Sequence, residues 1–261
     1  MIEMKIAIIG AGAMGGSLAQ GMLNAKVVPA QNLFVADPSQ EALERFAKQG
    51  AKVTTYNREA VEQADFIFLV VKPWLAEDVL EDIADLLTDG KCLVSIAAGV
   101  GSEDLRQWAG DKCSLLMAIP NIAIAHRASM TFLAPVEAAD EQTEQVKKIF
   151  DEMGKTCICN EAHLSVGMAL ASCGIAYAFR YIRAASEGGV ELGFKASQSK
   201  EIVMQTLKGA IALLEADNVH PEEAIDRVTT PGGYTIKGLN AMEEAGFTNA
   251  VIQGLKASVK K

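Results

Sequence analysis

The stretch that decides the fold is MKIAIIGAGAMGGSLAQGM, residues 4–22. It begins with the apolar run Ile6–Ile9, breaks into Gly10, Gly12 and Gly15, and continues with the apolar spacing of a helix. In a nucleotide-binding turn of this kind, the first glycine permits a tight turn, the second lets the backbone approach a pyrophosphate, and the third lets the helix pack on the strand. The helix N-terminus also attracts an anion. The stretch therefore predicts a dinucleotide site; an ordinary tight turn between strand and helix is the alternative.

A carboxylate follows the next apolar run, NLFVADPSQ, residues 32–40. Asp37 lies about 20 residues beyond the glycine turn, the spacing of an acid that binds the ribose hydroxyls of a dinucleotide. Because a carboxylate repels a 2′-phosphate, Asp37 favours NADH over NADPH. Two alternatives remain open: a phosphate held by Ser39, Arg45 or Lys48, and a role for Asp37 at a helix N-terminus with Pro38 as the first helical residue.

Strands and helices then alternate as far as residue 160. Expected strands lie at 51–56, 65–71, 91–98 and 113–119, with helices from Asn57, after Trp74 and from Ser102. The strands are apolar throughout, as in a sheet covered on both faces. The segments 129–135, 140–153 and 155–160 extend this sheet. The sequence therefore predicts a doubly wound, Rossmann-type parallel sheet over residues 1–160, an α/β domain that binds ligands beyond the carboxyl ends of its strands.

The pattern changes at residue 161. Leu164–Phe179 carries no charged residue and begins a helix of roughly 30 residues, about 45 Å long; further helices are expected at 195–217, 220–228 and 235–259. A helix that is apolar on every side needs protein around it, and its glycine, serine and cysteine content favours a buried helix over a membrane span. One small helical domain, 161–261, cannot supply that cover. We therefore expect long helices from two chains to interleave, with a homodimer as the minimum assembly.

The segment RVTTPGGYTIKGL, residues 227–239, is the second candidate for a binding site. A Pro-Gly-Gly turn before a helix presents backbone N–H groups with little obstruction, and the helix end favours an anion. We interpret it as a carboxylate grip, in which Thr235 holds a neighbouring group such as a ring nitrogen; Thr235 as an ordinary helix N-cap is the alternative. The long helix offers no general base, so the pattern favours a substrate that is already electrophilic, such as a protonated C=N bond.

Composition narrows the class of protein. The chain has 261 residues and a formal net charge of −9, which argues against a nucleic-acid surface. Five cysteines at irregular spacing and an N-terminus without a signal pattern predict reduced thiols and a cytoplasmic protein. Cys157 and Cys159 share a strand face, but no partner completes a metal site, so we expect small core residues and no metal. The histidines are expected to be caps or surface residues: His126, His163 and His220.

The chain resembles the pyrroline-5-carboxylate reductase family from end to end. The motifs GAGAMG, VVKP, SIAAGV, IPN, AYAF and HPEEAIDRVTTPGGYTI follow the family's landmarks in order. The resemblance implies an N-terminal dinucleotide domain, a helical dimerisation domain, and reduction of 1-pyrroline-5-carboxylate, a cyclic imine carboxylate, to L-proline with NADPH or NADH. It implies cofactor contacts at Gly10, Ala11, Gly12, Ala13, Met14, Gly15, Asn57, Val70, Val71, Lys72, Pro73, Ala97, Ala98 and Gly99, with Asn121 nearby. It also implies substrate contacts at Thr230, Gly232, Gly233 and Thr235, where Thr235 hydrogen-bonds the imine nitrogen as the catalytic residue.

Two segments depart from the family pattern. IPNIA stands where the family reads MPNTP, placing Ile122 and Ala123 after Asn121, and ASCGIAY at 171–177 replaces SGSGPAY. Cys173 is a poorer hydrogen-bond donor than serine, and Ile175 restores a backbone N–H that favours a straighter helix. These changes leave two alternatives: an imine or carbonyl reductase of the same fold for another small carboxylate, or a nucleotide-binding regulator without turnover.

Overall fold

A computed structural model describes residues 4–259 of the chain. The chain forms two compact units, of which the first ends at Ser172 and the second begins at Cys173. The limits 1–160 and 161–261 for the functional domains stay a prediction, since the break between compact units falls inside the long helix.

The first unit contains an eight-stranded sheet in the order β3-β2-β1-β4-β5-β6-β7-β8. Every neighbouring pair is parallel except β6 and β7, which are antiparallel. The strands are β1 (Ile6–Ile9), β2 (Leu33–Ala36), β3 (Lys52–Thr54), β4 (Phe66–Leu69), β5 (Cys92–Ser95), β6 (Ser114–Ile119), β7 (Ser129–Glu137) and β8 (Gly154–Ile158).

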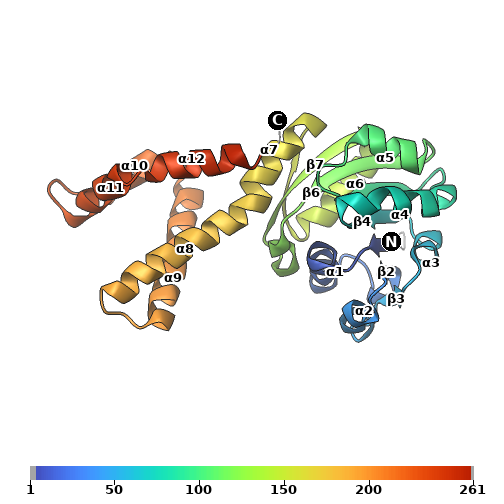
Figure 1. Ribbon diagram of the computed structural model, residues 1–261, viewed down its shortest axis with the longest axis horizontal. Coiled ribbons are helices and arrows are strands. Elements are labelled where there is room, and N and C mark those ends of the chain that lie inside the picture. Colours follow the sequence, from blue (N-terminus) through green and yellow to red (C-terminus); the bar gives the residue numbers. More distant parts are fainter. Residues whose placement is uncertain (1–3, 260–261) are drawn as a thin grey trace. The chain divides into compact units, whose positions relative to one another are not determined.

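Helices cover both faces of this sheet, as Figure 1 shows. One face packs on α1 (Ala13–Ala25), α2 (Gln40–Ala47) and α6 (Asp140–Asp151), with Phe46 and Phe150 in that core. The other packs on α3 (Asn57–Glu62), α4 (Ala76–Ile83) and α5 (Ser102–Ala109). Because alternate strand residues enter the two cores, β1, β2, β4 and β5 are buried along their whole length. The predicted doubly wound fold is confirmed.

One detail of this unit differs from the sequence prediction. β7 extends the sheet as expected but runs antiparallel, because a short 3₁₀ turn, Ile122–His126, joins it to β6 and leaves no room for a crossover. Cys157 and Cys159 are expected in the core, and both are half-buried. Cys157 lies in the edge strand β8, whereas Cys159, one residue past β8, packs against one of the two cores. Among residues 4–259 no three His, Cys, Asp or Glu side chains gather as a metal site.

The long helix is present but irregular. It runs through α7 (Glu161–Gly167), a π-helical segment Met168–Cys173 and α8 (Gly174–Glu191). A π-helical segment directly precedes α8, and the expectation that Ile175 favours a straighter helix stays a prediction. By length and composition alone, Glu161–Glu191 could cross a membrane, and 17% of its most apolar stretch is buried within the chain.

Up to residue 259, the second unit contains helices and connecting turns but no strand. α8 packs on α9 (Ala196–Asp217), where the Ser199 hydroxyl donates to the Ser186 carbonyl at 2.8 Å. A Cβ at Gly189 would lie 2.1 Å from the Ser199 hydroxyl oxygen, so close packing of these helices requires glycine there. The remaining helices are α10 (Pro221–Arg227), α11 (Tyr234–Glu244) and α12 (Phe247–Ala257). The single helix predicted at 235–259 is wrong, because Gly246 at φ +81° separates α11 from α12.

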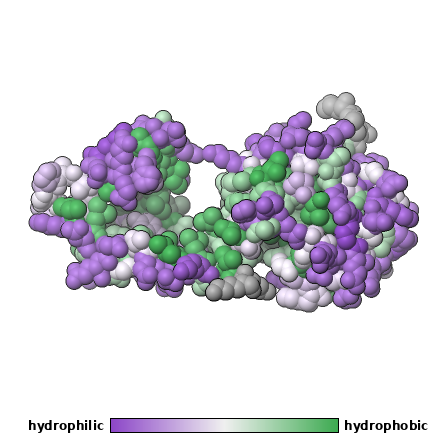
Figure 2. Space-filling view, turned by 90° about the horizontal axis from the view of Figure 1, so that it is seen from above, coloured by the Kyte–Doolittle hydropathy of each residue, from purple (hydrophilic) through white to green (hydrophobic). Residues whose placement is uncertain are grey.

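Hydrophobic residues remain at the surface of this helical unit, shown green in Figure 2. No residue of α8, all of which lies in the described part of the chain, is buried. Leu192 is 86% exposed and Phe179 is 59% exposed. A surface of this kind is typical of an interface between chains.

The buried thiol of Cys92 gives a test of the sheet core. Burial raises the pKa of Cys92 to about 12, with a smaller contribution from Cys113. The unfolded thiol ionises near its ordinary pKa, whereas the buried thiol stays protonated to a higher pH. The contribution of Cys92 to the free energy of unfolding is therefore complete below the ordinary thiol pKa. It is lost as the pH rises above that value, because ionisation then favours the unfolded chain. We expect the stability advantage of the wild type over Cys92→Ala to fall by about 1–2 kcal/mol between pH 8 and pH 10. Urea unfolding of both proteins measures it; a difference that does not change with pH would contradict the burial of this thiol.

Candidate functional site

The carboxyl ends of the parallel strands form one continuous edge. Backbone hydrogen bonds extend the ladder by one residue past each of these strands. The N–H of Gly10 donates to the Ala36 carbonyl at 2.7 Å, and that of Val70 to the Ile9 carbonyl at 2.8 Å. The N–H of Ile96 donates to the Leu69 carbonyl at 2.9 Å, and that of Asp37 to the Thr54 carbonyl at 3.2 Å. The loops after β1, β2, β4 and β5 therefore leave the sheet at the same level. This edge, which we call the dinucleotide edge, includes the point between β1 and β4 where the strand order reverses and where such sheets bind ligands.

Each glycine of the β1 turn meets a different constraint. Gly10 has φ +98°, and a Cβ there would lie 2.5 Å from the Val70 carbonyl oxygen. At Gly15 a Cβ would lie 1.9 Å from the Gly10 carbonyl oxygen, whereas at Gly12 it would meet no atom within 4 Å. No side chain caps α1, whose N-cap residue is Gly12. The turn thus leaves an open approach to the first helical N–H groups, which fits the pyrophosphate of a dinucleotide.

Asp37 contacts the glycine turn directly. Its Oδ2 accepts a hydrogen bond from the Ala11 N–H at 2.7 Å, and its Oδ1 accepts one from the Ser39 N–H at 2.9 Å. The alternative with Pro38 as the first helical residue is wrong, because α2 begins at Gln40 and Ser39 is its N-cap. The carboxylate is therefore held between two turns rather than at a helix end.

The other predicted cofactor residues follow strands along the same edge. Asn57 begins α3 after β3. Val70 and Val71 leave β4, and Lys72 and Pro73 begin a short 3₁₀ turn, Pro73–Leu75. After β5, Ala97 is buried, Ala98 is exposed and Gly99 has φ +82°. Together with the β1 turn, including Ala13 and Met14, these residues lie around one edge.

Asn121 follows β6 and is 5% exposed. Its Oδ1 accepts from the Ala123 N–H at 3.0 Å, and its Nδ2 donates to the Ala171 carbonyl in the π-helical segment at 3.2 Å. The Ser129 hydroxyl accepts from the Asn121 N–H at 3.1 Å and lies 3.2 Å from the Thr131 hydroxyl. Ser129 and Thr131 are not among the residues predicted from the sequence, although polar residues within the apolar run SMTFLAP indicate a buried network.

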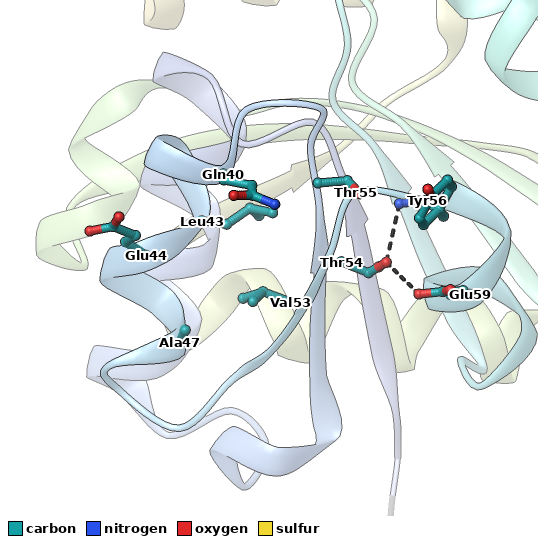
Figure 3. Close-up of a pocket in the computed structure, with 9 residues that line it drawn as sticks. All are labelled: Gln40, Leu43, Glu44, Ala47, Val53, Thr54, Thr55, Tyr56 and Glu59. Carbon is teal, nitrogen blue, oxygen red and sulfur yellow. Dashed lines mark hydrogen bonds between the residues drawn. The ribbon is translucent and has the colours of Figure 1, made fainter.

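A surface pocket of about 400 Å³ adjoins the edge near Asp37, between α2, β3 and the start of α3 (Figure 3). Leu43, Ala47 and Val53 form an apolar wall. The opposite side is polar: the Thr54 hydroxyl hydrogen-bonds the Glu59 carboxylate, and Tyr56 is 68% exposed. Sequence reasoning did not find this pocket, because its walls come from segments with no motif.

The second candidate site is a turn in the helical unit. The Gly233 N–H donates to the Thr230 carbonyl at 3.0 Å, with Pro231 and Gly232 between them and Gly232 at φ +70°, as in a type II turn. α11 begins at Tyr234 with Gly233 as a N-cap that has no side-chain bond, so the alternative with Thr235 as N-cap is wrong. The glycine cap leaves the first-turn N–H groups of α11 without a side-chain acceptor, and Thr235, the second helical residue, is exposed beside them.

The predicted residues thus form two groups, one on the dinucleotide edge of the first unit and one at the turn of the second unit. The altered segments lie in named elements: Ile122 begins the 3₁₀ turn after Asn121 and is 48% exposed, whereas Ala171 and Cys173 lie in the π-helical segment. His220 caps α10, because its Nδ1 accepts from the Glu222 N–H at 3.2 Å, which confirms the expected cap.

Comparison with known proteins gives two family matches. A model described as pyrroline-5-carboxylate reductase dimerisation matches residues 161–261. A second, described as NADP oxidoreductase coenzyme F420-dependent, matches residues 5–99. The first region includes the Thr230–Thr235 turn, and the second includes the β1 turn and Asp37.

Whole-chain relatives agree with these matches. Pyrroline-5-carboxylate reductase 1 of Dictyostelium discoideum is 36% identical over 98% of this chain, although the chain spans only 49% of that protein's length. Pyrroline-5-carboxylate reductase of Glycine max is 32% identical, with 98% of this chain and 94% of that protein covered. The crystal structure of Plasmodium falciparum pyrroline carboxylate reductase with NADP bound superposes with a TM-score of 0.92 at 27% identity, covering 99% of this chain and 96% of that one.

Substitution of the two contrasting glycines tests the β1 turn. Gly15→Ala forces a Cβ against the Gly10 carbonyl, so we expect it to lower the free energy of unfolding by about 3 kcal/mol or more. Gly12→Ala adds a methyl group in open space and should stay within about 1 kcal/mol of the wild type. The same methyl group obstructs the approach to α1, so the dissociation constant for NADH should rise at least about tenfold.

Urea unfolding and fluorescence titration with NADH measure the two effects separately. Unchanged NADH affinity in a stable Gly12→Ala protein would contradict a pyrophosphate site at this turn.

Proposed function

The chain belongs to the pyrroline-5-carboxylate reductase family, and from this premise we propose that it reduces the C=N bond of 1-pyrroline-5-carboxylate to give L-proline. The observation that carries the proposal is the Thr230–Gly233 turn, which lies inside the matched dimerisation region and leads into a helix without a side-chain cap. The enzyme is an NAD(P)H-dependent oxidoreductase. A bound nicotinamide dinucleotide supplies the hydride when the substrate is in place.

The dinucleotide edge supports the cofactor role of the first unit. The space beside Gly12 is open, and a Cβ at this position would partly fill it. The N–H groups of the first turn of α1 adjoin this space and favour a pyrophosphate. Asp37 faces the ribose, while the loops at Asn57, Val70–Pro73 and Ala97–Gly99 line the rest of the edge. Asn121 holds the 3₁₀ turn after β6 and the π-helical segment in place, since the two polar atoms of its side chain bond the Ala123 N–H and the Ala171 carbonyl.

The turn in the second unit supports the substrate role. Thr230, Gly232 and Gly233 form the turn that contacts the substrate carboxylate. The Gly233 N–H closes this turn on the Thr230 carbonyl, so the first-turn N–H groups of α11 are the donors that the turn leaves open to the anion. Thr235 keeps its hydroxyl next to this anion site, where it hydrogen-bonds the ring nitrogen and orients the C=N bond. A protonated imine is already electrophilic, so the protein's main contribution is orientation rather than strong acid catalysis.

We further propose a cytoplasmic homodimer as the working unit. The matched dimerisation region and the exposed apolar helices support assembly between copies of the chain. The same match favours a protein partner over lipid for the apolar helix Glu161–Glu191, and the acidic net charge disfavours nucleic acid. The domain limits 1–160 and 161–261 are retained in this proposal because the matched region begins at residue 161.

The direct test of the function is oxidation of NADH and of NADPH at 340 nm with purified protein and pyrroline-5-carboxylate, with proline identified as product. Turnover to proline is the expected result despite Ile122 and Cys173. Cofactor binding without proline formation would contradict the proposal; activity on another cyclic imine or carbonyl carboxylate would support a different reductase of the same fold.

Thr235→Ala tests the role of the hydroxyl. We expect kcat to fall at least about tenfold, because a hydrogen-bond donor to the reacting group is lost, while the NAD(P)H dissociation constant changes little. Thr235→Ser keeps the hydroxyl and serves as the matched control that restores most of the activity. Equal losses in kcat and cofactor affinity would exclude this role.

Light scattering after size exclusion tests the assembly. We expect a mass of about twice 27.8 kDa or a multiple of it. Phe179→Asp places a charge on the exposed face of α8 and should shift the protein towards monomer. Ile158→Asp, a comparable substitution at an exposed position of β8, is the control that should leave the assembly intact. A monomeric wild type would refute the dimer.

A further inference from the structure

We propose that this chain selects NADH over NADPH through Asp37. The inference rests on the proposed function, because it concerns the cofactor of the same site. Three features of the described structure carry it: the anchoring of the carboxylate, the use of neighbouring donors by that carboxylate, and the charges around the adjoining pocket.

Two hydrogen bonds fix the Asp37 carboxylate, and a third fixes its backbone. It accepts from the N–H groups of Ala11 and Ser39, and the Asp37 N–H donates to the Thr54 carbonyl. These bonds span the ends of β1, β2 and β3. A carboxylate has about four acceptor positions, so two remain for the vicinal hydroxyls of a ribose. The group is thus positioned before any ligand arrives, which favours a ribose with a free 2′-hydroxyl.

One backbone donor that a 2′-phosphate would use in this turn is already engaged. The Ser39 N–H is bonded to Asp37, while the Ser39 hydroxyl oxygen accepts from the Ala42 N–H at 3.3 Å, which holds that side chain at the cap of α2. Glu41, in the first turn of that helix, is exposed to solvent that screens its charge. A phosphate here would have to displace the bond of the Ser39 N–H to use that donor, and it would lie beside the fixed negative charge of Asp37.

The cations of α2 and β3 have other contacts. The Arg45 guanidinium lies 4.5 Å from the Phe46 ring centroid. Its Nη2 also lies close to Gly16, since a Cβ added at Gly16 would be 1.9 Å from that nitrogen. Lys48 pairs with Glu44 at 3.5 Å, and the Lys52 ammonium lies 4.8 Å from the centroid of the Phe34 ring. The Arg45 guanidinium reaches Gly16, directly after the β1 turn, so Arg45 is the residue to test against Asp37.

The pocket shares Thr54 with Asp37, since the Thr54 carbonyl accepts from the Asp37 N–H and its hydroxyl bonds Glu59. The lining residues include Glu44 and Glu59 and no Lys or Arg. Glu44 pairs with Lys48 and points away from Val53 in Figure 3, so Glu59 supplies the negative charge on this side. A dianionic phosphate that approached Thr54 would meet this like charge, and like-charge contact is a strong source of discrimination.

The test compares kcat/KM for NADH and NADPH in the wild type, Asp37→Asn and Glu41→Gln. Asparagine keeps an acceptor for the Ala11 N–H and removes the charge. We expect the wild type to prefer NADH at least about tenfold and Asp37→Asn to lose at least about tenfold of that ratio, chiefly by better use of NADPH. Glu41→Gln removes an equal charge from an exposed position and should change the ratio less than about threefold, because solvent screens it.

Direct titration of NADH and NADPH without substrate separates this inference from the proposed reaction. If no proline forms with either cofactor, the reaction fails, but the ratio of the two dissociation constants still decides the role of Asp37. Proline formation with a wild-type preference for NADPH, or an unchanged ratio in folded Asp37→Asn, would overturn the inference and leave the reaction standing.

Arg45→Gln supplies the opposing test. We expect it to leave the ratio within about threefold of the wild type, since Arg45 is held over Phe46. A selective loss of NADPH affinity of about tenfold or more would mean that Arg45 binds a 2′-phosphate, which would also overturn the inference. If Asp37→Asn does not fold, the wild-type dissociation constants and this variant are sufficient to decide.

Discussion

The rest of the dinucleotide edge depends on one contact, the approach of the Gly10 carbonyl oxygen to residue 15, where a Cβ would be 1.9 Å away. This approach lets α1 begin directly after β1, so its unpaired N–H groups point to the edge where the other strands end. Gly10 faces a second constraint from the Val70 carbonyl, which joins the β1 turn to the loop after β4. The position of the anion site is therefore determined by backbone packing, and the open side at Gly12 is what that packing leaves.

The sequence was sufficient for the architecture of the first unit because local and long-range requirements coincide there. Runs such as IAII and FIFL must be covered on both faces, and the intervening helices supply that cover in the order in which they occur. The glycine turn and the acid after the next strand could be predicted for the same reason, since their spacing follows from one βαβ unit. The long helix could be predicted from its uncharged run.

The contacts of single side chains could not be predicted in this way. The spacing of Asp37 indicates its strand end but not its bond to the Ala11 N–H, which depends on the aligned ends of β1 and β2. Asn121 shows the same limit: its partner at Ala171 lies 50 residues away, in a π-helical segment with no distinct sequence signal. At the α11 terminus, threonine could cap the helix with its side-chain oxygen, which glycine lacks, yet the turn places Gly233 there. Tertiary packing decides each case.

The apolar surface of the helical unit bears on function as well as on assembly. α8 has no buried residue within its own chain, so its apolar faces gain little from burial until another chain covers them. The proposed substrate turn belongs to this same unit. If the unit assembles as proposed, each contact between chains stabilises the helices on which the turn is built, and the stability of the turn then depends on protein concentration. A binding site built on such helices is therefore linked to oligomerisation through the free energy of folding, even where no residue of a second chain touches the substrate.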